Sequence, residues 1–207
     1  MKKLNTNIRL KAGLILLMAS LLFPAWAKNS EVSAAENRVL QVTQSITKLL
    51  EKNKHIYINN SAQLNAMVRK EVLPFIDFTS MAKLTLGKHW RTANSQQRTR
   101  FINAYREMLV RSYAKTMLEY TGAKIRSGKS VANKKPGYVL VRTVVTPKTG
   151  ASIAANYNVR KNSGDWKAYN VEIGGINLIT NFRTNFTREV SAKGLNALIT
   201  RLEKTAK

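Results

Sequence analysis

The residue types that most often carry out catalysis or bind metals are scarce in this chain. Its 207 residues include no cysteine, two histidines and eleven acidic residues. His55 and His89 lie far apart, with no other histidine or cysteine at ligand spacing, so we interpret each as a surface or interface histidine and not as a zinc ligand. Gly128-Lys129-Ser130 matches the end of a phosphate-binding loop, but the earlier glycine is missing and the segment leads from a helix into strands, the reverse of that motif's context. The sequence therefore indicates neither an enzyme nor a metal site, and leaves open only a catalytic site assembled from distant residues.

The first 27 residues have the pattern of a secretory signal peptide. Four basic residues precede or open an uncharged apolar run over residues 12–23, which is too short to span a bilayer. Ala25-Trp26-Ala27 then fits the small-x-small pattern of a cleavage site, so we expect cleavage before Lys28. The alternative is an N-terminal membrane anchor, which the short run and the cleavage pattern disfavour. The expected organisation is a signal peptide over residues 1–27 and a single domain over residues 28–207, a length that can bury a sizeable core.

The chain is strongly basic. Thirty-five lysines and arginines against eleven acidic residues give a net charge of +24, of which the expected signal peptide holds only four charges. The basic residues are spread along the chain, in runs no longer than pairs such as Arg69-Lys70, and there is no polybasic tail. A basic domain of this kind can bind nucleic acid, but export argues against that partner. Two interpretations stay open: a solvated basic surface, or attraction to anionic membrane surfaces or acidic partners.

Hydrophobic residues at spacings of three and four predict helices on both sides of a central sheet. A first amphipathic helix is expected within residues 31–54, and a shorter second helix begins with Ser61 as its cap. After the sheet, helical spacing resumes at residue 176 and continues to the C-terminus.

The segment between residues 71 and 120 organises the domain. Asp77 is expected to cap a short helix that Gly87 closes. Asn94 and Gln97 form a capping box at the start of a long helix. One apolar stripe follows that helix: Phe101, Tyr105, Met108, Leu109, Ser112, Tyr113, Met117 and Tyr120. Periodicity does not distinguish a filled core from a cavity lined by the same side chains, so both interpretations stay open.

Short β-branched segments separated by turn residues predict an antiparallel meander. The segments with this pattern are 138–145, 151–160 and 166–173, with a weaker fourth candidate over 123–131. Strict alternation would place Tyr169, Val171 and Ile173 on one face of the third strand. Helices before and after such a sheet predict a single α+β domain.

Several motifs taken together resemble the MlaC family, also called toluene-tolerance auxiliary proteins. They are Leu73-Pro74-Phe75-Ile76-Asp77-Phe78, Met81-Ala82, Leu86-Gly87-Lys88-His89-Trp90, Gln97-Arg98, Tyr105-Arg106, Trp166-Lys167-Ala168-Tyr169-Asn170-Val171 and Gly175-Ile176-Asn177-Leu178-Ile179. The resemblance covers nearly the whole chain after the signal peptide, in the same order. The chain departs from the family pattern at Asn170, Gly174 and Asn177.

The resemblance implies a periplasmic phospholipid carrier of a Gram-negative bacterium. It implies a monomer with an NTF2-like fold, in which N-terminal helices pack on a twisted antiparallel sheet of about four strands and C-terminal helices follow. An apolar cavity in this fold would hold the acyl chains. The resemblance also implies no enzymatic activity and no cofactor besides the phospholipid cargo. The implied partners are an outer-membrane lipoprotein–porin complex and an inner-membrane ABC transporter with an MCE-type lipid-binding domain. The function would be to shuttle phospholipids between the two membranes and so maintain the lipid asymmetry of the outer membrane.

On this hypothesis fifteen apolar residues from both layers line the lipid pocket. They are Met81, Leu84, Phe101, Tyr105, Met108 and Tyr113 from the helices, Val139, Val141, Ile153, Tyr157, Tyr169, Val171 and Ile173 from the sheet, and Ile176 and Ile179 at the closing edge. Two alternatives belong to other classes. One is a cationic, exported envelope-binding protein with a filled core and no lipid cargo, and the other is an exported enzyme on a similar cone-shaped fold.

Overall fold

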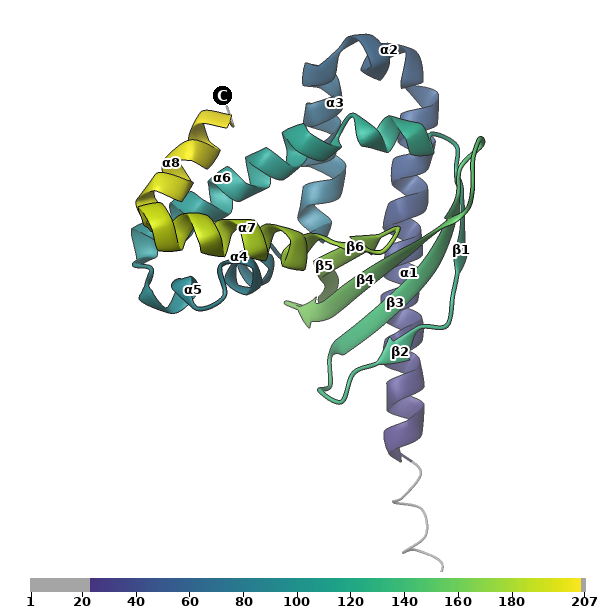
Figure 1. Cartoon of the computed structure of the whole chain (residues 1–207). Helices are drawn as coiled ribbons and strands as arrows, with labels where there is room; N and C mark the ends of the chain where they lie inside the picture. Colours follow the sequence, from purple (N-terminus) through teal and green to yellow (C-terminus); the bar gives the residue numbers. More distant parts are fainter. Residues whose placement is uncertain (1–22, 206–207) are drawn as a thin grey trace, which may run out of the picture.

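A long N-terminal helix lies across one face of a twisted sheet, and the later helices pack together beside the sheet (Figure 1). The computed structural model describes residues 23–205, so most of the expected signal peptide lies outside the described residues, and residues 23–27 form the start of the first helix. The helical elements before the sheet are α1 (Phe23–Lys52), α2 (Lys54–Asn59), α3 (Ser61–Met67), the π-helix η1 (Val68–Val72), the 3-10 helix η2 (Leu73–Phe75), α4 (Phe78–Leu86), α5 (His89–Thr92), α6 (Ser95–Tyr113) and the 3-10 helix η3 (Thr116–Tyr120). Those after it are α7 (Leu178–Lys193) and α8 (Leu195–Thr205).

Six strands of the described chain form one sheet in the order β1-β3-β4-β5-β6, with β2 also paired to β3. They are β1 (Lys124–Ser127), β2 (Val131–Ala132), β3 (Tyr138–Thr146), β4 (Ile153–Asn162), β5 (Asp165–Ile173) and β6 (Ile176–Asn177). All five pairings are antiparallel. The predicted α+β domain and its three-strand meander are therefore confirmed, and the weak fourth segment is divided into β1 and β2.

Local capping explains where the helices of the central segment begin. The Asn94 side chain accepts a hydrogen bond from the Gln97 amide, and the Gln97 side chain accepts one from the Asn94 amide, which confirms the predicted capping box. Asp77 caps α4 by accepting from the Ser80 amide at 3.0 Å, and Gly87 closes that helix with a φ of 56°, as predicted.

Several helix boundaries differ from the prediction, including that of the helix expected from residue 176, because Ile176 lies in β6 and α7 begins at Leu178. The cap of α3 is Asn60, whose side chain accepts from the Gln63 amide, and Ser61 is the first helical residue. The long helix α6 ends at Tyr113, and the apolar stripe continues on the separate 3-10 helix η3. Asparagine is as good a cap as serine, so the choice between neighbouring cap residues is not determined by residue type.

A register shift in the sheet changes the direction of one predicted site residue. The pairing of β4 with β5 is irregular between Asn158 and Val159, which leaves Tyr169 of β5 without a partner in β4. The Tyr169 ring lies 5.8 Å from that of Tyr138, on the face opposite to buried Val171. The prediction that Tyr169 and Val171 share a face is therefore wrong, because the extra residue of a β-bulge shifts the alternation.

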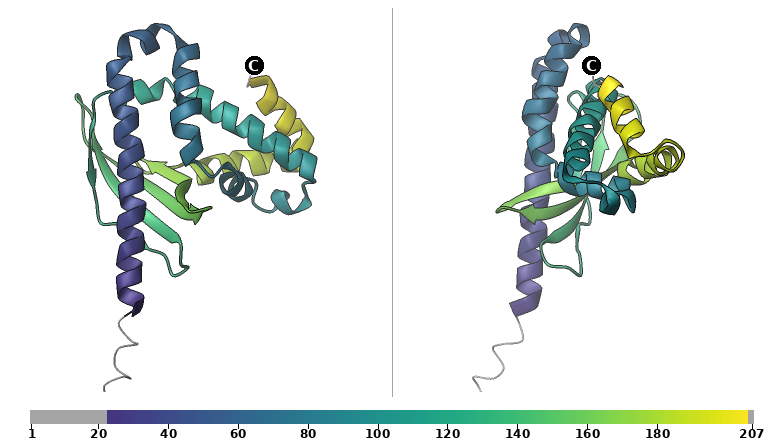
Figure 2. Two further views of the ribbon diagram at one scale, coloured as in Figure 1. Left: turned by 180° about the vertical axis from the view of Figure 1, so that it is seen from behind. Right: turned by 90° about the vertical axis from the view of Figure 1, so that its left-hand side faces the viewer.

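The buried side chains form two separate hydrophobic cores and a small third cluster. The sheet core joins α1 to the inner face of the sheet, and its members include Ala35, Val39, Val42, Ile46, Leu50, Phe75, Val139, Val141, Val159, Trp166, Ala168 and Val171. The helical core joins α4, α6, α7 and α8, and its members include Met81, Phe101, Tyr105, Met108, Ile179, Phe186, Leu198 and Leu202. The third cluster consists of Ala123, Val145 and Ala155 at one end of the sheet. Views from behind and from the side show that the helices carrying the helical core lie beside the sheet, while α1 covers one face of the sheet (Figure 2).

Candidate functional site

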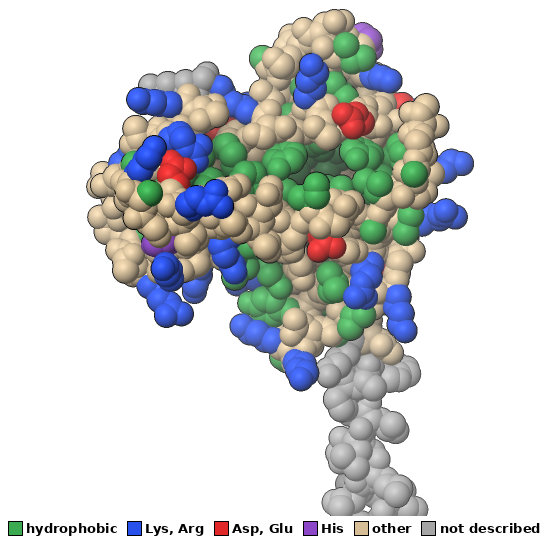
Figure 3. All heavy atoms as spheres, viewed as in Figure 1, with side chains coloured by type: hydrophobic (Ala, Val, Ile, Leu, Met, Phe, Trp, Pro, Cys, Tyr) green, Lys and Arg blue, Asp and Glu red, His purple; other side chains and the backbone are tan. Residues whose placement is uncertain are grey.

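The molecule is hollowed between its helices and its sheet. In the view shared by Figures 1 and 3, the hollow lies between η3 and the end of α6 on one side and β6 and the start of α7 on the other, and hydrophobic side chains cover its walls. The tight turn between β5 and β6 borders this region. It is made by Gly174 and Gly175, which both have positive φ values, as a two-residue hairpin of the type I′ class requires.

The elements around the hollow carry apolar side chains that are only partly buried. Ile173 and Ile176 face each other across the β5–β6 hairpin and are 40% and 59% exposed. Half-buried neighbours on the surrounding elements are Tyr113, Met117, Tyr120, Ile153, Tyr157, Leu178 and Phe182. Exposed large apolar residues that gather on one surface, instead of being scattered singly, are typical of a binding site.

The predicted site residues from the helices are mostly inside the helical core. Met81, Phe101, Tyr105, Met108 and Ile179 are at most 8% exposed and pack against one another and the C-terminal helices. Leu84, in contrast, is 37% exposed.

The predicted residues from the sheet are divided between its core and the region of the hollow. Val139, Val141 and Val171 belong to the sheet core, and Tyr169 lies on the opposite face. Ile153 and Tyr157 are half-buried next to the small third cluster. Sequence reasoning did not include Met117, Tyr120, Leu178 and Phe182 among the site residues, although their positions on the apolar stripes were visible in the sequence.

Tyr157 has the most perturbed environment among the residues near the hollow. Its ring lies 6.5 Å from the Phe75 ring. Burial raises the pKa of the Tyr157 phenol to about 12, and a hydrogen bond with Thr143 offsets part of that shift. The phenol is therefore neutral throughout the physiological pH range and presents an uncharged wall.

The raised pKa of Tyr157 predicts a loss of stability at alkaline pH. Above pH 10 the phenol ionises in the unfolded chain but stays protonated in the folded protein up to about pH 12, so the unfolded state binds fewer protons and unfolding becomes more favourable as the pH rises. The expected loss is about 2 kcal/mol between the two pKa values. Urea unfolding at pH 9 and pH 11, compared between the parent and Tyr157→Phe, detects about half of the total effect, because pH 11 lies midway between the two pKa values. An identical pH dependence in both proteins would contradict the assignment.

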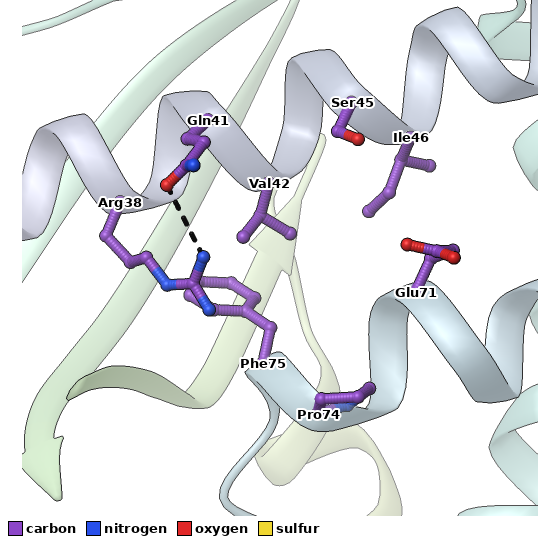
Figure 4. Close-up of a pocket in the computed structure, with 8 residues that line it drawn as sticks. All are labelled: Arg38, Gln41, Val42, Ser45, Ile46, Glu71, Pro74 and Phe75. Atoms are coloured by element: carbon purple, nitrogen blue, oxygen red, sulfur yellow. Dashed lines mark hydrogen bonds between the residues drawn. The ribbon is translucent and has the colours of Figure 1, made fainter.

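A small polar pocket lies on the other side of the sheet core, between α1 and the η1–η2 segment (Figure 4). It has a volume of about 250 Å³ and is lined by Arg38, Gln41, Val42, Ser45, Ile46, Glu71, Pro74 and Phe75. The Arg38 guanidinium is already engaged, since it donates to Asp165 at 3.0 Å and to Gln41 at 3.5 Å. None of the predicted site residues lies in this pocket, and its mixed lining does not suit an acyl chain.

No group of three or more histidine and acidic side chains among residues 23–205 could hold a metal ion. No helix in that part of the chain combines the length and the apolar composition needed to cross a membrane.

Known proteins with similar sequences point to one family. The family model described as MlaC protein matches residues 40–204. The intermembrane phospholipid transport system binding protein MlaC of Haemophilus influenzae is 23% identical over 146 residues, which is 69% of this chain and 68% of that protein. Toluene tolerance protein Ttg2D of Pseudomonas putida is 26% identical over 188 residues, which is 89% of this chain and 84% of that protein.

A solved structure supports the same fold. The phospholipid-binding protein from Ralstonia solanacearum, solved in complex with a phospholipid, superimposes with a TM-score of 0.76 over 83% of this chain and 96% of that chain, at 21% identity. The family model spans most of this chain. The resemblance seen in the motifs is thus confirmed, and the chain belongs to the MlaC family.

Proposed function

We propose that this chain is a phospholipid carrier that moves lipids between the outer and inner membranes through the periplasm. In this proposal residues 1–27 are removed as a signal peptide, and residues 28–207 act as one binding domain without enzymatic activity. The observation that supports it most strongly is the hollow lined with apolar side chains in a member of the MlaC family. The phospholipid bound by the Ralstonia protein of the same fold supports the same cargo.

The energetics of lipid transfer explain why such a carrier is needed. Two sixteen-carbon chains contain roughly 30 methylene groups, and removing them from water is worth about 25 kcal/mol. A lipid therefore does not cross an aqueous compartment at a useful rate unless its chains are covered. The same magnitude means that release requires a docked acceptor that takes up the chains as they leave the carrier.

The proposed contacts follow from burial. The acyl chains would touch those partly exposed members of the predicted set that lie around the hollow, Tyr113, Ile153, Tyr157, Ile173 and Ile176. The buried members of the predicted set, in the sheet core and the helical core, would pack behind these residues and fix the shape of the pocket.

The proposed donors and acceptors are membrane complexes. They are an outer-membrane lipoprotein–porin complex and an inner-membrane ABC transporter with an MCE-type lipid-binding domain, and the carrier would work as a monomer between them. The strongly basic surface would meet acidic patches or anionic headgroups on these partners.

Native mass spectrometry of the protein purified from a bacterial periplasm tests the proposal. A mass excess equal to one or more whole phospholipids, lost on denaturation and recovered by chloroform extraction, is the expected result. An empty protein with no recoverable lipid would favour the cationic envelope-binding alternative with a filled core.

Replacing Ile176 with glutamate is expected to abolish retention of lipid while leaving the protein folded. The side chain is 59% exposed on the β5–β6 hairpin, so the fold tolerates the change, but a carboxylate there would have to lose water when acyl chains pack against it. Ile58→Glu is the matched control, because Ile58 is 56% exposed on α2. An Ile176→Glu variant that still copurifies with as much lipid as the Ile58→Glu variant would contradict the placement of the site.

A further inference from the structure

No helix within residues 23–205 packs over the central strands on one face of the sheet. The inner face carries Val139, Val141 and Val159 and is covered by α1, as the view from behind shows (Figure 2). The side chains that alternate with these point to the outer face, which is turned toward the viewer in Figure 1, where no helix lies in front of β3 and β4. This outer face is therefore open to a partner.

A row of polar and basic side chains crosses the outer face at one end. Tyr138 of β3 is in register with Arg160 of β4, and Arg160 is in register with Lys167 of β5. Directly opposed residues in antiparallel strands have Cβ atoms about 5 Å apart, so these side chains are neighbours. Lys135, from the turn before β3, adds a second lysine, because its Nζ atom lies 3.3 Å from the Tyr138 hydroxyl and 4.6 Å from the centre of that ring.

The positive charge of this row is only partly compensated. Arg160 forms an ion pair with Asp77, whose carboxylate is buried, while no carboxylate of the described residues lies within ion-pair distance of Lys135 or Lys167. Hydrogen bonds from Arg160 and Lys135 lower the pKa of the Tyr138 phenol, which indicates a positive potential at its oxygen.

The whole sheet segment has the same imbalance. Residues 124–177 include ten lysines and arginines but two acidic residues. Of these two, Asp165 is paired with Arg38 of α1, and Glu172 accepts a hydrogen bond from Asn156. Within this segment no further carboxylate is available to the row, and the carboxylate beside it comes from Glu31 of α1, which accepts a hydrogen bond from the Gly137 amide at 3.2 Å.

Tyrosines accompany the basic residues on this face. The Tyr138 and Tyr169 rings meet edge to face with their centroids 5.8 Å apart. Tyrosine together with lysine and arginine is the composition of surfaces that lie at the headgroup level of membranes. An uncovered sheet face can lie along a bilayer surface.

We propose that this outer face, defined by Lys135, Tyr138, Arg160, Lys167 and Tyr169 and called here the basic sheet face, binds the phosphate headgroups of an anionic membrane surface. The hollow is visible from the same side of the molecule (Figure 3), so binding through the basic sheet face turns the mouth of the hollow toward the headgroup region. This surface is separate from the cargo site, and it attracts the membrane whether or not the hollow holds a lipid.

Cosedimentation of the whole protein with vesicles tests the proposal. Vesicles of phosphatidylcholine mixed with phosphatidylglycerol are expected to bind the protein, and vesicles of phosphatidylcholine alone are expected to bind it weakly. The variant Lys135→Glu with Lys167→Glu should partition onto the anionic vesicles at least about thirtyfold less, since each lysine near an anionic surface contributes about 1 kcal/mol. Raising the salt concentration should weaken binding of the parent, because it screens exposed charges.

The matched control is Lys48→Glu with Lys204→Glu, which changes the net charge equally at exposed positions on α1 and α8. This control is expected to lose much less binding than the variant of the basic sheet face. Equal losses in both variants would overturn the proposal in favour of a diffuse effect of net charge. Unchanged binding of the Lys135/Lys167 variant would also overturn it and would leave the face to an acidic protein partner. Copurifying lipid is measured in every variant, so failure of membrane binding is distinguished from failure of the carrier function.

Discussion

Replacing Phe101 with alanine is expected to lower the free energy of unfolding by about 4 kcal/mol. The Phe101 side chain is completely buried, stacks on Tyr105 with ring centroids 5.5 Å apart, and meets the edge of Phe186 at 5.9 Å. Truncation removes these contacts and leaves a cavity that three helices cannot easily fill. Urea unfolding at neutral pH, followed by circular dichroism, measures the loss.

The same variant distinguishes a filled core from a lipid-lined cavity around Phe101. If the ring is a core residue, the folded fraction of Phe101→Ala should retain as much lipid as the parent, and Phe101→Leu should recover most of the lost stability because it restores most of the buried volume. A variant that keeps its stability but loses its lipid would show instead that the ring contacts the cargo. The closed packing of the helical core leads us to expect the first outcome.

Replacing Asp77 with alanine is expected to cost about 3 kcal/mol, through two losses that occur together. The Asp77 carboxylate caps α4 by accepting from the Ser80 amide, and it forms the ion pair with Arg160. Its own side chain is 4% exposed, so its removal leaves the Arg160 guanidinium, which is 28% exposed, without its partner. Thermal unfolding at neutral pH measures the effect.

Two further variants separate the cap from the ion pair. Asp77→Asn keeps an oxygen that can cap α4 but loses the charge, so it should be less destabilising than alanine. Asp77→Ala combined with Arg160→Met removes both charges and should recover part of the loss, since no unpaired guanidinium remains. If the double variant were no more stable than Asp77→Ala alone, the ion pair would contribute little and the cap would explain the whole effect.

Local signals were sufficient to predict the elements that depend on neighbouring residues. The capping box of Asn94 and Gln97 depends on two side chains three positions apart, and the alternation of β4 is visible in the sequence from Ile153 to Arg160. The order of helices and strands follows from such patterns. For this reason the α+β class and the antiparallel meander could be predicted without a structure.

Features that depend on strand pairing are harder to predict from the sequence. The position of Tyr169 follows from a bulge between β4 and β5, and alternation within β5 alone does not reveal it. The helical spacing predicts a helix from Ile176 onward, whereas Ile176 lies in β6, which pairs with β5. The sequence Ile173-Gly174-Gly175-Ile176 did contain a hairpin signal, because two glycines between β-branched residues favour a type I′ turn.

The candidate site was predictable as a region but not as a set of contacts. Periodicity showed that Phe101 and Tyr113 lie on one face of the same helix, and both were expected to line the pocket. In the structure Phe101 is completely buried, whereas Tyr113 is half-buried with its ring 6.5 Å from Phe182. Whether an inward-facing residue meets another side chain or an empty space depends on the distance between layers, which a single sequence does not contain.

The two hydrophobic cores cannot close at the same time as the chain emerges into the compartment where it folds. The buried members of the sheet core all precede α7, so a chain that emerges N-terminus first can complete it early. The helical core forms only when Phe186 and Leu202 pack against the part of the chain around Phe101, from which the whole sheet segment separates them in sequence. Closing so long a loop lowers the entropy of the chain before any stabilising contact forms. Until α7 and α8 have emerged, the apolar faces of α4 and α6 stay exposed to solvent. The chain is therefore most prone to aggregation just before its last helix emerges.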